Sequence, residues 1–154
     1  LALGQAEGRC DFSVERVAIN VQDARIPDNA GVQPIDVPVI AGGPAAYFST
    51  LPIKSLVAGL KAAGFPASVS QTAGTFVCNQ LFYALQHTLA GLGVHSGFMH
   101  LPLLPEQAAQ WKSPSLPSWP ASLQIAGVTQ ALTLLLAQRQ QGLSDAAISG
   151  GTLN

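Results

Sequence analysis

The sequence predicts an α/β fold, namely a three-layer, open and twisted sheet that is mainly parallel and carries helices on both faces. The first observation behind this prediction is order, because patterns typical of strands alternate along the chain with patterns typical of helices. The second is composition, because 48% of the 154 residues are hydrophobic and only 10% are charged. A chain of this length and composition suits one domain with a large core.

Two candidate strands open the chain and lead into a long loop. Residues 1–5 look like the end of a strand that is already under way, and residues 14–21 form the second strand. The only methionine is Met99, so we expect that Leu1 is not a translation start and that the chain begins inside the domain. Residues 22–48 are rich in Pro, Gly, Asp and Asn. A loop of that length is expected to serve a site or an interface.

A helix and a short strand follow this loop. Residues 51–64 have apolar side chains at the three- and four-residue spacing that is typical of a helix, with Thr50 as its cap and Gly64 at its end. The predicted core face of this helix consists of Ile53, Leu56, Val57 and Leu60. Residues 67–71 are expected to form the strand that comes next.

The second half of the chain contains two more helices, separated by a strand and a loop. We expect helices over residues 75–91 and 122–141, a buried strand over residues 94–101, and a proline-rich surface loop over residues 102–120. The predicted core face of the first helix consists of Val77, Leu81, Ala84, Leu85, Thr88 and Leu89. That of the second consists of Ile125, Val128, Leu132, Leu135 and Leu136.

The chain as a whole is expected to divide into a single α/β domain, residues 1–141, and a flexible tail, residues 142–154. Its formal net charge is -1 and its basic residues are scattered singly, so neither nucleic acid nor an anionic membrane is expected as a partner. No uninterrupted apolar run reaches the roughly 18 residues of a membrane span. Cys10 and Cys78 are too few for a disulfide framework, which favours a reduced compartment and a cytoplasmic location.

Cys78 is a candidate nucleophile because it lies where a loop passes into the predicted helix of residues 75–91. We expect Thr75 to cap that helix. The unpaired N–H groups of the first turn and the positive end of the helix dipole would then lie beside the sulfur, and both favour the thiolate. The alternative is a cysteine that only packs in the core, which is the commoner role of a free cysteine.

Three histidines could serve Cys78 as a base, and their spacing distinguishes them. His87 lies nine residues after Cys78 on the same predicted helix, where the two side chains point to opposite sides. His95 and His100 belong to one predicted strand but face opposite sides of the sheet. His100 is the better candidate, because it lies at the carboxyl end of its strand, where open α/β sheets bind their ligands.

Six short blocks of sequence together resemble one enzyme family. In chain order they are Gly4-Gln5-Ala6 with Gly8-Arg9, Glu15-Arg16-Val17-Ala18-Ile19-Asn20, Asp23-Ala24-Arg25-Ile26-Pro27-Asp28-Asn29, Gly74-Thr75-Phe76-Val77-Cys78-Asn79, Gly97-Phe98-Met99-His100 and Leu103-Leu104-Pro105-Glu106-Gln107. These blocks are similar to those of pyroglutamyl peptidase I, also called pyrrolidone-carboxylate peptidase, and they occur in the family's order over roughly residues 1–141.

The resemblance implies a cysteine peptidase that removes an N-terminal pyroglutamate (5-oxoproline) from peptides, with no metal and no cofactor. It implies that Cys78 is the nucleophile, His100 the base, and Glu15 the carboxylate that orients the histidine. The residues alone do not single out Glu15, because four aspartates lie near the same loops. These are Asp11, Asp23, Asp28 and Asp36.

The resemblance also implies a substrate pocket and an assembly. Arg25 falls at the position whose neighbourhood helps to bind the developing oxyanion. The positions that line the family's pyroglutamate pocket are Gln5, Ile26, Phe76 and Val77. Family members are often tetramers, so a homo-oligomer is expected.

Two other functions remain open at this point. The family's opening strand and its loop with two phenylalanines have no counterpart in this sequence, so one alternative is a truncated or degenerate relative without activity that acts only in binding or assembly. The other alternative is a thiol hydrolase with a different substrate, because a fold and its catalytic residues do not fix specificity.

Overall fold

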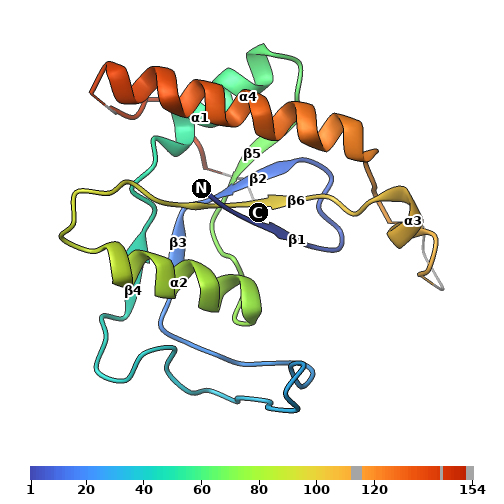
Figure 1. Ribbon diagram of the computed structural model, residues 1–154, viewed down its shortest axis with the longest axis vertical. Helices are drawn as coiled ribbons and strands as arrows, with labels where there is room; N and C mark the ends of the chain where they lie inside the picture. The colour runs from blue at the N-terminus through green and yellow to red at the C-terminus, as the bar shows by residue number, and fades with distance from the viewer. Residues whose placement is uncertain (112–115, 143, 152–154) are drawn as a thin grey trace.

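A four-stranded mixed sheet forms the centre of the computed structural model, which describes residues 1–111, 116–142 and 144–151. The strands lie in the order β1 (Ala2–Gln5), β6 (Phe98–Leu101), β2 (Phe12–Glu15) and β5 (Ala67–Ser70). β1 pairs with β6 in parallel, β2 pairs with β5 in parallel, and the central β2–β6 pair is antiparallel. The sheet is therefore mainly parallel (Figure 1).

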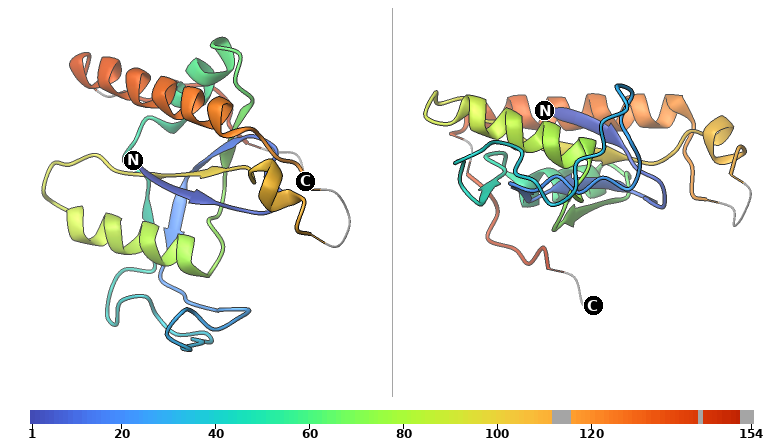
Figure 2. Two further views of the ribbon diagram at one scale, coloured as in Figure 1. Left: turned by 45° about the vertical axis from the view of Figure 1, so that its right-hand side comes forward. Right: turned by 90° about the horizontal axis from the view of Figure 1, so that it is seen from below.

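Helices cover both faces of this sheet. Helices α1 (Ile53–Ala62) and α4 (Ala121–Gln140) pack on one face, and helix α2 (Val77–Leu89) lies on the other (Figures 1 and 2). Two separate apolar clusters fill the spaces between the layers, one beneath α1 and α4 and one beneath α2. The predicted three-layer α/β fold is confirmed.

Alternation along β2 places polar side chains on the face that α2 covers. Phe12 and Val14 belong to the apolar cluster beneath α1 and α4. The residues between and after them, Ser13 and Glu15, therefore point to the opposite face. Both are buried, and so is His100 on the neighbouring strand β6.

The second predicted strand is wrong in its bounds, and the loop after it contains a strand. Instead of residues 14–21, the chain forms β2 and then β3 (Val17–Ile19), which leaves the main sheet and pairs with β4 (Ala46–Phe48). The break falls at Arg16, whose N–H still donates to the carbonyl oxygen of Ser70 beside β2. Strand β4 lies at the end of the loop predicted for residues 22–48.

Both helix caps predicted from the sequence are wrong. Helix α1 begins after Pro52 rather than Thr50, and its first N–H groups donate to the carboxylate of Asp145. Helix α2 begins after Phe76 and has no side-chain cap. The hydroxyl of Thr75 donates instead to the carbonyl oxygen of Asp23 at 2.9 Å, which ties the start of α2 to the long loop.

The predicted core faces of α2 and α4 are also wrong. On α2 the buried residues are Asn79, Phe82, Tyr83 and Gln86, whereas Val77 and Leu81 are exposed. On α4 the prediction is wrong for Ile125, Leu132 and Leu136, which are exposed, and right for Val128 and Leu135, which pack against the core beside the buried Gln124, Gly127 and Ala131. The predicted face of α1 is confirmed, since its four apolar residues are all buried.

The chain after β6 departs from the predicted plain loop. A short helix, α3 (Pro105–Ala108), lies within residues 102–120, of which residues 112–115 lie outside the described part. By length and composition alone, α4 is the one helix among the described residues that could cross a membrane. Gly127 of this helix packs closely on Phe12 of the core.

Candidate active site

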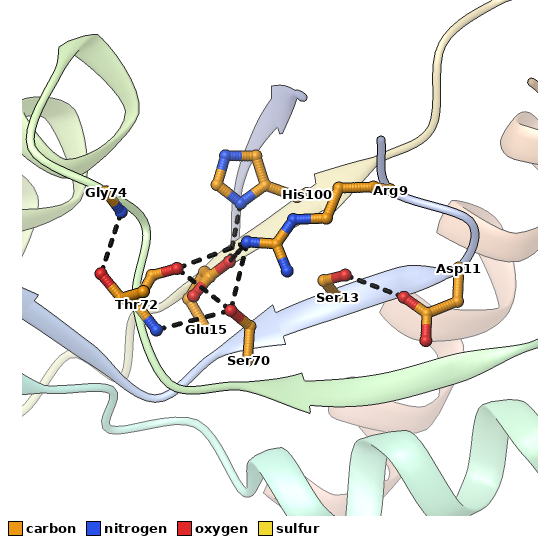
Figure 3. Close-up of polar contacts among 8 residues, drawn as sticks. All are labelled: Arg9, Asp11, Ser13, Glu15, Ser70, Thr72, Gly74 and His100. Carbon is orange, nitrogen blue, oxygen red and sulfur yellow. Dashed lines mark hydrogen bonds and ion pairs between the residues drawn. The ribbon is translucent and has the colours of Figure 1, made fainter. Parts of the chain in front are cut away.

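Glu15 and His100 meet at the centre of the sheet, on the face that α2 covers. The carboxylate Oε1 of Glu15 lies 2.7 Å from Nδ1 of His100, and both side chains are almost completely buried (Figure 3). The antiparallel pairing of β2 with β6 produces this contact, because it sets His100 opposite Ser13, two residues before Glu15. With Nδ1–H donated to the carboxylate, the other ring nitrogen of His100 is left for a second partner.

Cys78, the second residue of helix α2, is the candidate for that second partner, because it lines the same cavity as His100. The close approach of strand β1 to this helix depends on Gly4, because a Cβ there would lie 2.5 Å from the ring of Phe98 and 3.1 Å from the sulfur of Cys78. The sulfur therefore lies against strand β1 as well as beside His100. Cys10, the other free cysteine, is exposed in the turn after β1.

The surroundings of His100 act on its pKa in opposite directions. Burial of the ring by itself lowers the pKa, because it removes water from the charged form. The neighbouring Cys78, and Glu15 through its hydrogen bond and its negative charge, act against burial and prevail. The pKa of His100 is therefore raised above its ordinary value, and the imidazolium form is favoured.

Cys78 and His100 open onto a cavity of about 450 Å³. Of the residues predicted for substrate binding, Gln5, Phe76 and Val77 line this cavity, and so does Arg25. The side chain of Arg25 is 87% exposed and lies 3.4 Å from the carboxylate of Glu7.

Ile26 lies apart from this cavity. It lines an adjoining cavity of about 790 Å³ beneath the long loop, which shares Thr75, Phe76 and Val77 with the first. The structure thus brings seven of the eight predicted site residues to one cavity or its inner wall. Ile26 is on the far side of the Phe76–Val77 wall.

The other two histidines lie away from Cys78. His87 accepts from or donates to the hydroxyl of Tyr47 through Nδ1, at 2.8 Å, on the side of α2 that faces β4. His95 is exposed and pairs with the carbonyl oxygen of Thr50. It lies outside β6, which begins at Phe98 rather than at residue 94, so the predicted start of that strand is wrong.

Three residues that contact this site were given no role from the sequence. Arg9 contacts Glu15, Gln107 exchanges hydrogen bonds with Gln5, and Asn79 binds the backbone of β3 beside Cys78. All three belong to the blocks described above, but nothing in their local pattern indicates their partners, which lie 6 to 102 residues away in the chain.

The arrangement has the parts needed for acyl transfer. A thiol lies beside an imidazole, the imidazole donates to a buried carboxylate, and the thiol is in the first turn of a helix, where backbone N–H groups lack intrahelical partners. Such N–H groups can stabilise an oxyanion. Among the described residues, no three His, Cys, Asp or Glu side chains gather as metal ligands would.

Comparison with known protein sequences finds relatives that are named pyrrolidone-carboxylate peptidases. Residues 1–138 match a family described as "Pyroglutamyl peptidase". The chain is 56% identical over 151 residues to a pyrrolidone-carboxylate peptidase of Erwinia tasmaniensis, which covers 98% of this chain and 68% of that protein. It is 63% identical over 131 residues to one of Pseudomonas fluorescens, which covers 84% of this chain and 62% of that protein.

Solved structures agree with the sequence relatives. The fold matches pyroglutamyl peptidase I of Bacillus amyloliquefaciens with a TM-score of 0.83 and 44% identity, over 96% of this chain and 68% of that one. It matches pyrrolidone carboxyl peptidase of Thermococcus litoralis with a TM-score of 0.89 and 34% identity, over 96% of this chain and 69% of that one. The chain thus spans roughly two thirds of the length of these relatives.

Proposed function

Because the chain belongs to the pyroglutamyl peptidase family, we propose that it is a cysteine peptidase that removes an N-terminal pyroglutamate residue from peptides. The observation that carries this proposal is the contact of 2.7 Å between Glu15 and His100, made beside Cys78. The same three residue types form the catalytic group that the sequence resemblance implies.

Each of these three residues has one role in the proposed reaction. His100 takes the proton of Cys78, and the thiolate attacks the carbonyl carbon of the pyroglutamyl amide. The amide nitrogen then leaves with a proton from His100, and a thioester remains on Cys78. Water, deprotonated by His100, hydrolyses the thioester and releases pyroglutamate, while Glu15 holds the ring and stabilises its imidazolium form.

The remaining predicted residues bind the substrate in this proposal. Backbone N–H groups at the start of α2, with the backbone near Arg25, stabilise the oxyanion. The lactam ring carries no free α-amine, so its site needs an apolar wall and a few polar groups rather than a carboxylate. Phe76 and Val77 supply the wall, Gln5 supplies an amide, and Ile26 supports the wall from the adjoining cavity.

The location and assembly of the protein complete the proposal. We place it in the cytoplasm, acting on peptides without nucleic acid or membrane as a partner, and as a homo-oligomer that by family resemblance is a tetramer. The exposed apolar residues of α4, Ile125, Leu132 and Leu136, support an assembly. Sedimentation equilibrium measures the oligomeric state directly.

Substitution of the two cysteines tests the proposed reaction. We expect the purified chain to hydrolyse a chromogenic pyroglutamyl amide, Cys78→Ser to abolish turnover, and Cys10→Ser to retain it. Turnover by Cys78→Ser would contradict the proposed nucleophile. A folded chain that hydrolyses nothing would support the alternative of an inactive relative, and faster cleavage of free glutamyl or prolyl amides would support a hydrolase with another substrate.

A further inference from the structure

Arg9 lies in the turn between β1 and β2 and reaches the carboxylate of Glu15. Its terminal nitrogen Nη2 is 3.2 Å from Oε1 of Glu15, 3.3 Å from the hydroxyl of Ser70 and 3.4 Å from the carbonyl oxygen of Thr72 (Figure 3). The side chain of Arg9 is 30% exposed, whereas that of Glu15 is 0% exposed. The guanidinium group is therefore the solvent-facing partner of a buried carboxylate.

Glu15 is a buried charge whose contacts all fall on one oxygen. Oε1 contacts Nδ1 of His100 and accepts a hydrogen bond from Nη2 of Arg9. Oε2 has no hydrogen-bond partner in the part of the chain that the structure describes. A buried carboxylate without compensating charge takes up a proton instead. His100 compensates the charge only while it is protonated, whereas an arginine is positively charged at every pH of interest. When His100 is the neutral base, the positive charge beside Glu15 is that of Arg9.

The contacts of Arg9 also join Glu15 to the loop that carries the nucleophile. Ser70 ends strand β5, and Thr72 begins the segment that leads to α2. The hydroxyl of Thr72 accepts a hydrogen bond from the N–H of Gly74 at 3.0 Å, two residues before Phe76. One guanidinium group thus connects the end of β2 with the chain that leads to Cys78.

We infer that Arg9 is a positioning residue for this reaction, which compensates the buried charge of Glu15 and keeps its Oε1 directed at Nδ1 of His100. The inference rests on the proposed function, in which Glu15 orients His100. It also gives a role to the Gly8-Arg9 block of the sequence. Arg9 touches neither the sulfur nor the cavity residues in any contact described above, so it acts through Glu15.

Removal of the charge of Arg9 should move the pH dependence of thiol reactivity in one definite direction. A nearby positive charge favours the negatively charged form of a neighbour, so loss of Arg9, or of the imidazolium that Glu15 stabilises, disfavours the thiolate and moves its reaction to higher pH. The other charged groups near the cavity are Glu7, Asp23 and Arg25, and Asp11 is bound to Ser13 on β2. These groups are unchanged in the variants below, so they do not alter this direction.

The test is the pH dependence of Cys78 alkylation by iodoacetamide, measured in a Cys10→Ser background so that one thiol reacts. In Arg9→Met and Arg9→Gln we expect the acidic midpoint to rise by about one pH unit, or about ten-fold slower alkylation at a fixed acidic pH. Arg9→Lys keeps the positive charge, so its midpoint should lie close to that of the Cys10→Ser parent. Arg16→Met is the matched control, because Arg16 also joins β2 to the end of β5, through Gln71, without touching Glu15.

Hydrolysis of a pyroglutamyl amide by the same variants gives the second readout. We expect Arg9→Met to lower kcat far more than it raises KM, since Arg9 acts on the reacting groups and not on the substrate. The inference would be overturned if the alkylation midpoints of Arg9→Met and Arg9→Gln both equalled that of Arg16→Met. It would also be overturned if these variants only lowered the maximal alkylation rate and left the midpoint unchanged. Shifted alkylation in a chain that hydrolyses no substrate would contradict the proposed function and still support the action of Arg9 on Glu15.

Discussion

Glu15 controls the protonation of its neighbour at the scale of single residues. Its buried carboxylate is one of the two groups that raise the pKa of His100 above the ordinary 6.5, against the effect of burial. Because the folded pKa is raised, the protonated ring adds stability that is fully present below about pH 6.5. That stability is lost as the pH rises through the folded pKa. The same interaction therefore appears in the free energy of unfolding and in the proposed catalysis.

Glu15→Gln should weaken both the pH-dependent stability and the proposed catalysis. Without the charge, the pKa of His100 falls, and NMR titration of its ring measures that fall directly. The loss of stability between pH 6 and pH 8 should also become smaller in urea unfolding. For the proposed reaction we expect kcat to fall by about 10³-fold or more, because a glutamine does not stabilise imidazolium.

Glu106→Gln is the matched control for this change, because Glu106 is exposed on α3. It should leave the titration of His100, the unfolding profile and kcat unchanged. An unaltered pKa of His100 in Glu15→Gln would contradict the proposed coupling between the two residues.

Helix α2 shows at the scale of elements why apolar spacing predicted the wrong faces. Its buried face includes Asn79 and Gln86, which spacing rules assign to the solvent side. Gln86 donates to the carbonyl oxygen of Ser96 and accepts from its hydroxyl, so both ends of its amide are bonded. Gln124 of α4 is buried for the same reason, with its amide bonded to backbone carbonyls. Tertiary hydrogen bonds allow these polar residues to replace apolar ones in the interior.

Asn79 fixes the position of α2, and with it the position of Cys78. It is 0% exposed and accepts from the N–H of Ile19 while donating to the carbonyl oxygens of Ile19 and Val21. Asn79→Ala removes the hydrogen-bond partner of these three part-buried backbone groups. We expect the free energy of unfolding to fall by about 3 kcal/mol, as measured by urea denaturation.

The matched control is Gln80→Ala, one residue further along the same helix, where the side chain is exposed. It should change the free energy of unfolding by less than about 0.5 kcal/mol. Equal effects of the two substitutions would mean that Asn79 does not anchor the helix.

At the scale of the whole molecule, the C-terminal segment is connected to the middle of the chain. Asp145, within the segment predicted to be a flexible tail, accepts hydrogen bonds from the N–H groups of Lys54 and Ser55 at the start of α1. The carbonyl oxygen of Gly150 accepts from the side chain of Gln71, after β5. Residues 143 and 152–154 of that segment lie outside the described part. The flexibility of residues 142–154 stays a prediction.

Asp145→Ala tests whether this contact stabilises the fold in solution. We expect a loss of about 1 kcal/mol in the free energy of unfolding, because the first N–H groups of α1 lose their acceptor. Asp145→Asn keeps an acceptor oxygen and should lose less. Ser144→Ala, at an exposed neighbour, should lose nothing measurable, and a loss equal to that of Asp145→Ala would contradict the capping role.

The sequence by itself determined the class of fold and the residues to examine. Strand and helix alternation predicted the layers, and spacing along the chain chose His100 over His87 and His95. These are properties of local order, since the direction of a side chain follows from its position in a helix or strand. The motif blocks added Glu15, which local pattern could not separate from the nearby aspartates.

Only the tertiary structure decided which partners these residues have. The cap of α1 lies 91 residues from Lys54, and the contacts of Arg9 with Ser70 and of Gln5 with Gln107 span 61 and 102 residues. Periodicity carries no information about such pairs, because they form when separate strands and loops are brought together by packing of the core. Cys78 was a candidate from its place in the sequence, and packing placed it at the same cavity as His100, with its sulfur beside Gly4.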